Sequence, residues 1–83
     1  MGDVIIDLAK EVVGYCEDGD LMTALSFYES EIRPAVEDVE SHELQDLLDV
    51  MKSQAELVDN EEWQKVMENV DKMGTILRNN GHL

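Results

Sequence analysis

The sequence predicts an all-α fold, a small four-helix bundle built from two helical hairpins. Two observations carry this prediction: apolar residues recur at helical spacing almost throughout the 83 residues, and turn-forming residues divide them into four segments. The alternation of apolar and polar residues that marks a β-strand is absent. The length suits a single domain, residues 1–83, because half of it would be too short to form a core of its own.

The first hairpin is expected to run up to the proline at position 34. Its first helix, residues 3–17, carries the apolar stripe Ile5, Leu8, Val12 and Tyr15. In the turn that follows, Gly19 supplies a left-handed backbone position and Asp20 caps the next helix. This second helix is expected to bury Leu21, Ala24, Leu25, Tyr28 and Ile32. It then ends or kinks at Pro34, which has no N–H to donate, and residues 35–40 either continue it beyond a bend or form a short turn.

The second hairpin is expected to begin at Ser41, a suitable N-cap for a third helix. The apolar stripe of that helix is Leu44, Leu47, Leu48, Met51, Ala55 and Val58. Asp59 and Glu62 then resemble a capping box for the fourth helix, with Val58 and Trp63 as its hydrophobic staple. The fourth helix carries inward Trp63, Val66, Met67, Val70, Met73 and Leu77, and it ends at residues 79–81, Asn-Asn-Gly.

No residue pattern points to catalysis, so the chain is expected not to be an enzyme and to hold neither a metal nor a cofactor. Cys16 is followed by Glu17 and Asp18, which oppose thiolate formation, and its place beside the apolar stripe favours a packing role. A cysteine pair for zinc, a Glu-x-x-His pair for iron and the spacing of a calcium loop are all missing. In length and charge the chain resembles acyl carrier proteins, but none of its serines lies in their Asp-Ser-Leu motif.

The charge is very unequal, with 6 Lys and Arg against 20 Asp and Glu and a net charge of −14. This balance excludes direct binding to nucleic acid or to an anionic membrane, both of which need basic side chains. The acidic residues concentrate in two groups, Glu17, Asp18 and Asp20, and Glu37, Asp38, Glu40, Glu43, Asp46 and Asp49. We expect these groups to bind a partner protein with a basic surface. The alternative is that they serve only solubility or tolerance of salt.

In general character the chain resembles the small acidic inhibitors of phages and plasmids and the nuclease-immunity proteins of bacteria, which implies a nucleic-acid mimic that inhibits its partner. The first hairpin also resembles a tetratricopeptide unit, through Tyr15, the turn 18–20, Ala24 and Tyr28, although Glu31 stands where that family has a small residue. This second resemblance implies an adaptor, or a homodimer, that binds through an apolar groove. Its candidate anchors lie off the main stripes: Phe27, Met22, Trp63 and Ile76. A single cysteine and the lack of an apolar run of about 20 residues favour the cytoplasm.

Overall fold

The computed structural model describes residues 3–83, and within them the protein is an all-α bundle of two helical hairpins, as predicted. The first hairpin pairs α1 with a longer helical segment made of three parts, and the second pairs α4 with α5. The elements are α1 (Val4–Glu17), α2 (Leu21–Phe27), the π-helical turn η1 (Tyr28–Ile32), α3 (Arg33–Glu37), α4 (Gln45–Asp59) and α5 (Trp63–Asn79).

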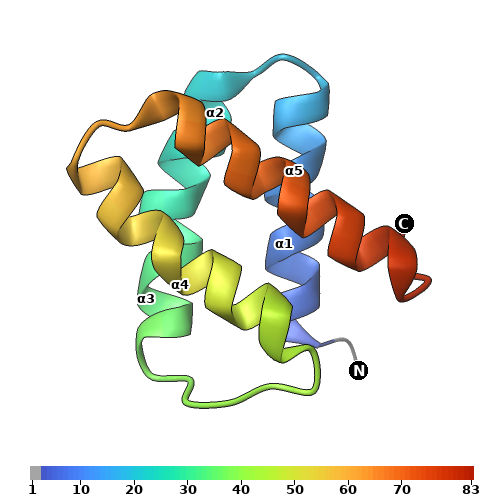
Figure 1. Ribbon diagram of the computed structural model, residues 1–83. Helices are drawn as coiled ribbons and strands as arrows, with labels where there is room; N and C mark the ends of the chain where they lie inside the picture. Colours follow the sequence, from blue (N-terminus) through green and yellow to red (C-terminus); the bar gives the residue numbers. More distant parts are fainter. Residues whose placement is uncertain (1–2) are drawn as a thin grey trace.

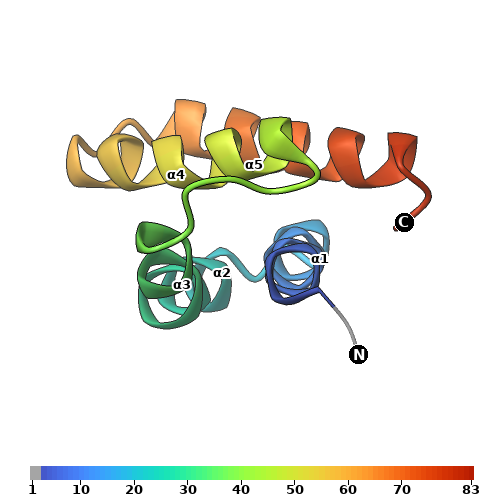
Figure 2. The same cartoon turned by 90° about the horizontal axis from the view of Figure 1, so that it is seen from below.

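The two hairpins form two layers. Seen from below, α4 and α5 lie side by side in one layer, and α1 lies beside α2 and α3 in the other (Figure 2). The helices of the second layer cross those of the first, so that α5 passes over α1 and α4 passes over α3 (Figure 1). The core fills the space between the layers, and its buried apolar residues come from every helix: Ile5, Ile6, Ala9, Val12, Val13, Ala24, Tyr28, Ile32, Val36, Leu47, Leu48, Met51, Val70, Met73 and Leu77.

The second helix of the first hairpin does not end at Pro34. Its backbone stays helical without a break from Leu21 to Glu37, and the π-helical turn Tyr28–Ile32 directly precedes the segment that contains the proline. Proline in a helix removes one backbone hydrogen bond and crowds the preceding turn, and a wider π turn is one way in which a helix accommodates such a disturbance.

Three helices end in the same hydrogen-bond pattern, in which one residue takes a left-handed conformation. After α1 this residue is Gly19, and after α5 it is Gly81, each with φ of 78°. Both glycines stand where the sequence predicts a helix end. After α4 the residue is Glu61, with φ of 55°, and the N–H groups of Glu61 and Glu62 donate to the carbonyls of Val58 and Leu57 at 3.1 and 3.0 Å. The turn between α4 and α5 therefore places a charged residue where glycine is favoured.

The prediction that Ser41 caps the third helix is wrong. The helix α4 begins four residues later, at Gln45, because His42 organises the connecting segment instead. The Nδ1 atom of His42 accepts a hydrogen bond from the N–H of Leu44 at 2.9 Å, and Nε2 lies 2.7 Å from Oδ2 of Asp3. With Nδ1 as acceptor, the proton is on Nε2 and is donated to Asp3. The connector is thereby attached to the beginning of α1.

The predicted capping box at the start of the fourth helix is also wrong. Asp59 is the last residue of α4, and α5 begins at Trp63 with Glu62 in the cap position and without a side-chain cap. The Asp59 carboxylate instead accepts two hydrogen bonds from the guanidinium of Arg33, at 3.0 and 2.7 Å. Arg33 also pairs with Glu29 at 3.1 Å, so that an ion-pair cluster joins the two hairpins.

Candidate functional site

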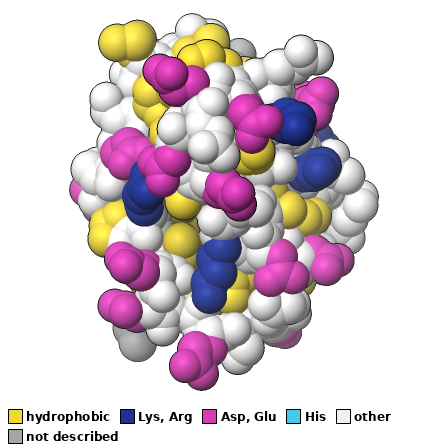
Figure 3. Space-filling view, turned by 60° about the vertical axis from the view of Figure 1, so that its left-hand side comes forward, with side chains coloured by type: hydrophobic (Ala, Val, Ile, Leu, Met, Phe, Trp, Pro, Cys, Tyr) yellow, Lys and Arg dark blue, Asp and Glu magenta, His cyan; other side chains and the backbone are white. Residues whose placement is uncertain are grey.

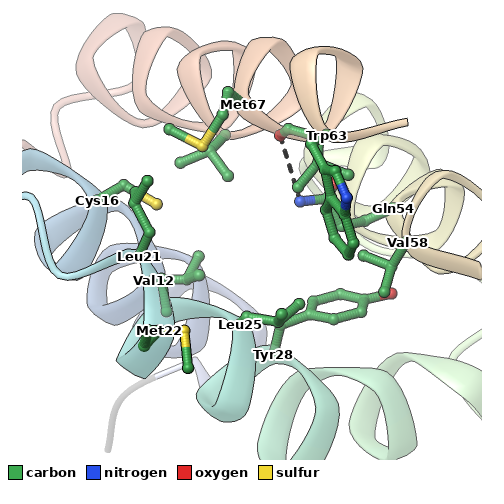
Figure 4. A pocket seen from close by; sticks show the side chains of 13 residues that line it. Val12, Cys16, Leu21, Met22, Leu25, Tyr28, Gln54, Val58, Trp63 and Met67 are labelled. Atoms are coloured by element: carbon green, nitrogen blue, oxygen red, sulfur yellow. Dashed lines mark hydrogen bonds between the residues drawn. The ribbon is translucent and has the colours of Figure 1, made fainter. Parts of the chain in front are cut away.

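An apolar pocket lies between the two hairpins, where the beginnings of α2 and α5 face each other (Figure 4). Its volume is about 240 Å³. The walls come from α1, α2, η1, α4 and α5, which contribute Val12, Cys16, Leu21, Met22, Ala24, Leu25, Tyr28, Gln54, Val58, Trp63, Val66, Met67 and Val70. Nearly all of these side chains are aliphatic, aromatic or thioether groups, so the pocket favours an apolar occupant.

The rim of the pocket exposes large apolar side chains. Met22 is 80% exposed, Leu21 49% and Trp63 47%. Sequence analysis placed Leu21 and Trp63 in the core, and this prediction is wrong because both residues lie in the first turn of a helix, at the edge of the layer contact. Three large apolar side chains exposed around one pocket form the kind of surface that soluble proteins keep for binding.

Two buried polar groups belong to the pocket wall and lack a hydrogen-bond partner. Gln54 is 2% exposed, and its Nε2 donates to the carbonyl of Val66 at 3.3 Å, but its Oε1 accepts no hydrogen bond. Tyr28 is also 2% exposed and its hydroxyl is unpaired; the oxygen lies beside Val58 (Figure 4), and burial raises the pKa of Tyr28 to about 12. The sequence analysis did not single out Gln54 because it is polar, although its spacing of three residues from Met51 places it on the apolar stripe of α4.

The four apolar anchors predicted from the sequence divide into two pairs. Met22 and Trp63 line the pocket. Phe27 and Ile76 do not line it: both are partly buried against the core, and the ring of Phe27 packs edge-on against Tyr15 with the ring centres 5.6 Å apart. The structure therefore brings only Met22 and Trp63 together at one place.

The nine acidic residues predicted to bind a partner are all exposed, but they do not form one surface. The group at 17–20 lies in the turn between α1 and α2, and the group at 37–49 lies around the connector between α3 and α4, at the opposite end of the molecule (Figure 1). Figure 3 shows the side that lies to the left in Figure 1, where acidic side chains are scattered among basic, apolar and other ones. The group nearer the pocket is 17–20, since Asp20 caps α2 and directly precedes Leu21.

In the described part of the chain the side chains that could bind a metal ion are dispersed, and the pocket wall contains one cysteine. Cys16 lines the pocket, but burial raises the pKa of its thiol and the nearby Asp71 carboxylate raises it further. Within residues 3–83, no three His, Cys, Asp or Glu side chains are placed to share a metal ion. None of the helices in the described part of the chain has the length and apolar character that crossing a bilayer requires.

Comparison of the chain with protein-family models, with curated proteins and with solved structures gives no match.

Proposed function

We propose that the protein is a non-enzymatic binding module that takes an apolar side chain of a basic partner protein into the pocket between its hairpins. The observation that carries this proposal is the pocket itself, about 240 Å³ in volume, with Met22, Leu21 and Trp63 exposed at its rim. Exposed apolar side chains of this size reduce solubility unless a partner covers them. Methionine side chains are flexible and polarisable, which suits a surface that adapts to an inserted group.

The net charge of −14 supports a basic partner. A complementary field accelerates encounter and orients the partner before contact. A homodimer through this pocket would bring two strongly acidic copies together, and the repulsion between them disfavours it. Asp20 directly precedes Leu21 and places a carboxylate next to a rim residue, where a basic group flanking an apolar anchor would meet it. Glu62, which precedes Trp63, is already paired with Lys65 at 3.1 Å.

The acidic group at 37–49 would form a separate surface, because it lies at the far end of the molecule from the turn between α1 and α2 (Figure 1). Inhibition of a nucleic-acid-binding protein by mimicry would use that surface. The only observation that supports this role for the group at 37–49 is the charge of its six exposed carboxylates. The pocket has the additional support of shape and exposed apolar area, and the experiment below compares the two surfaces directly.

The test uses a designed basic peptide of about 18 residues, five helical turns, with leucine on one face and lysine on the other. Trp63 is the single tryptophan of the chain, so its fluorescence reports occupation of the pocket by a peptide that lacks tryptophan. A scrambled peptide of the same composition, which lacks an apolar face, controls for attraction by charge. We expect the amphipathic peptide to bind more tightly and to shift the Trp63 emission to shorter wavelength.

Two protein variants locate the binding surface. Met22→Ser removes an exposed rim side chain, and Val4→Ser removes a side chain that is 64% exposed and lies outside the pocket. We expect Met22→Ser to weaken peptide binding about tenfold or more, because burial of a methionine side chain contributes about 1.5–3 kcal/mol, and Val4→Ser to leave it unchanged. Equal binding by both variants and the parent would show that the pocket is not the site.

A third variant examines the acidic surface. Changing Asp46 and Asp49 together to asparagine removes two exposed charges at the far end of the molecule, while an amide oxygen at position 49 can still accept the hydrogen bond that Gln45 donates. We expect this variant to bind the peptide with a slightly slower association rate and nearly unchanged dissociation. A larger loss of affinity than that of Met22→Ser would assign binding to the group at 37–49.

A further inference from the structure

A second hollow, the seam hollow, continues the apolar pocket along the contact between α1 and α5 and has a volume of about 120 Å³. Three wall residues belong to both hollows: Cys16 of α1, and Met67 and Val70 of α5. Cys16 lies on the side of the pocket away from Trp63 and Val58 (Figure 4). A partner segment with one side chain in the pocket can therefore continue along α1 and α5 and stay in contact with the protein.

The seam hollow differs from the pocket because charged side chains line it. They are Glu17, Asp71 and Arg78, and all three are exposed. Burial raises the pKa of the Cys16 thiol and the Asp71 carboxylate raises it further, so this carboxylate lies near the junction of the two hollows. Within residues 3–83, neither Glu17 nor Asp71 forms an ion pair. Two carboxylates against one guanidinium leave a net negative charge, which attracts a cation.

Other carboxylates near the pocket are less available to a cation. The Asp59 carboxylate, at the end of α4, is held by Arg33 at 2.7 Å, and Glu62 pairs with Lys65 at 3.1 Å. Glu68 forms no ion pair within the described residues, but the hollow that it lines shares a single wall residue with the pocket, whereas the seam hollow shares three. Continuity with the pocket and unpaired negative charge therefore coincide at the seam hollow.

We infer that the partner segment leaves the apolar pocket along α1 and α5 and places a lysine or arginine side chain in the seam hollow, paired with Asp71 and Glu17. This inference rests on the proposed function and adds the direction of the bound segment. Lysine and arginine bury their methylene groups on apolar surface while the charged end stays in water. Met67 and Val70 would supply that apolar surface, beside the two carboxylates.

The experiment uses the amphipathic peptide of leucine and lysine, with binding followed by the fluorescence of Trp63. Asp71→Asn removes one charge from the seam hollow, and Arg78→Gln removes its only cation. Glu68→Gln is the matched control, because it removes the same charge as Asp71→Asn from an exposed position of the same helix, on the Trp63 side of the pocket. Circular dichroism establishes that the variants are folded. A salt concentration of about 150 mM limits the effect of distant charges, since the screening length is then about 8 Å.

We expect Asp71→Asn to weaken binding about threefold to fivefold, because an exposed ion pair contributes up to about 1 kcal/mol. Glu68→Gln should change the affinity by less than about 1.5-fold. Arg78→Gln should tighten binding about twofold, because it removes a charge of the same sign as the bound cation. As a second measurement, on the ¹⁵N-labelled parent protein, the backbone amide resonance of Gly74 should shift more on binding than that of Gln64, since Gly74 lines the seam hollow and Gln64 the hollow beside Trp63.

The outcomes separate this inference from the proposed function. If Met22→Ser weakens binding but Asp71→Asn does not, or Glu68→Gln weakens it as much as Asp71→Asn, the pocket binds a partner whose segment does not follow the seam. Weaker binding by Arg78→Gln would also overturn the inference, because the seam hollow would then hold an anion. If Met22→Ser leaves binding unchanged, the proposed function and the inference are both wrong.

Discussion

Replacing Glu61 by glycine is expected to stabilise the protein. Glu61 has φ of 55°, a conformation that costs a residue with a side chain roughly 1–2 kcal/mol, whereas glycine adopts it freely. Glycine also loses more backbone entropy on folding, by roughly 0.5–1 kcal/mol, which offsets part of the gain. The net expectation is a stabilisation of about 0.5–1 kcal/mol. The Glu61 side chain is exposed, and the hydrogen bond of this residue in the turn runs from its backbone N–H to the carbonyl of Val58. Glycine keeps that N–H, so the substitution leaves the turn intact.

The measurement is urea unfolding followed by far-ultraviolet circular dichroism, with thermal unfolding beside it. For a domain of this size, the expected gain raises the melting temperature by about 2–8 °C and leaves the urea dependence of the free energy unchanged. Glu61→Ala is the control, because it removes the same negative charge and keeps a side chain in the left-handed conformation. A stabilisation by alanine equal to that by glycine would assign the effect to charge, and destabilisation by glycine would refute the left-handed conformation at this position.

Three other perturbations have defined outcomes. His42→Ala removes the hydrogen bonds to Asp3 and Leu44, and should lower the free energy of unfolding by about 1–3 kcal/mol in urea titrations; an unchanged midpoint would show that the connector is not held by them. The hydrogen bonds from Arg33 hold the pKa of Asp59 below its ordinary value of 3.8. The ionised carboxylate therefore stabilises the fold above that pH, and this contribution is lost as the pH falls through the lower pKa of the folded state. In acid unfolding the parent should lose its stability advantage over Asp59→Asn, and a constant difference between the two would contradict the pairing. The crowded negative charges should make the melting temperature rise when salt is increased from about 20 to about 500 mM, and a flat response would mean that the charges are too far apart to interact.

The helices and their pairing could be predicted because their signals are local and repeated. The apolar stripes of α1 and α4 follow helical spacing, and Gly19 and Gly81 mark helix ends because few other residues take their conformation at low cost. The end of α4 could not be found in this way, since Glu61 occupies the same conformation without being glycine. The caps predicted at Ser41 and Asp59 were wrong because contacts between distant parts of the chain, His42 with Asp3 and Arg33 with Asp59, determine those regions.

The candidate site could be predicted only in part. Met22 was recognisable because it departs from the main stripe of its helix, whereas Trp63 was assigned both to an inward stripe and to the candidate anchors. Met22 and Trp63 lie at one pocket, whereas Phe27 and Ile76 do not. This difference depends on how the two layers cross, which the residue pattern of a single helix does not indicate. Gln54 was missed because a polar residue is expected at the surface even where its spacing places it on the apolar stripe of α4. In the structure it is buried because α5 covers α4.

The placement of the polar links between the hairpins has a mechanical consequence. Among the described residues, two hydrogen-bonded pairs of side chains connect the first hairpin to the rest of the chain: Asp3 with His42 at the connector, and Arg33 with Asp59 at the end of α4. Neither lies at the start of α2, where only apolar contacts around the pocket hold the layers together. The two links lie in different places, one at the connector and one next to Val58 of the pocket wall, and the first turns of α2 and α5 are held by apolar packing alone. Backbone amides in the first turns of α2 and α5 should exchange with solvent before those in the middle of α4, and an occupant that fills the pocket should slow them most.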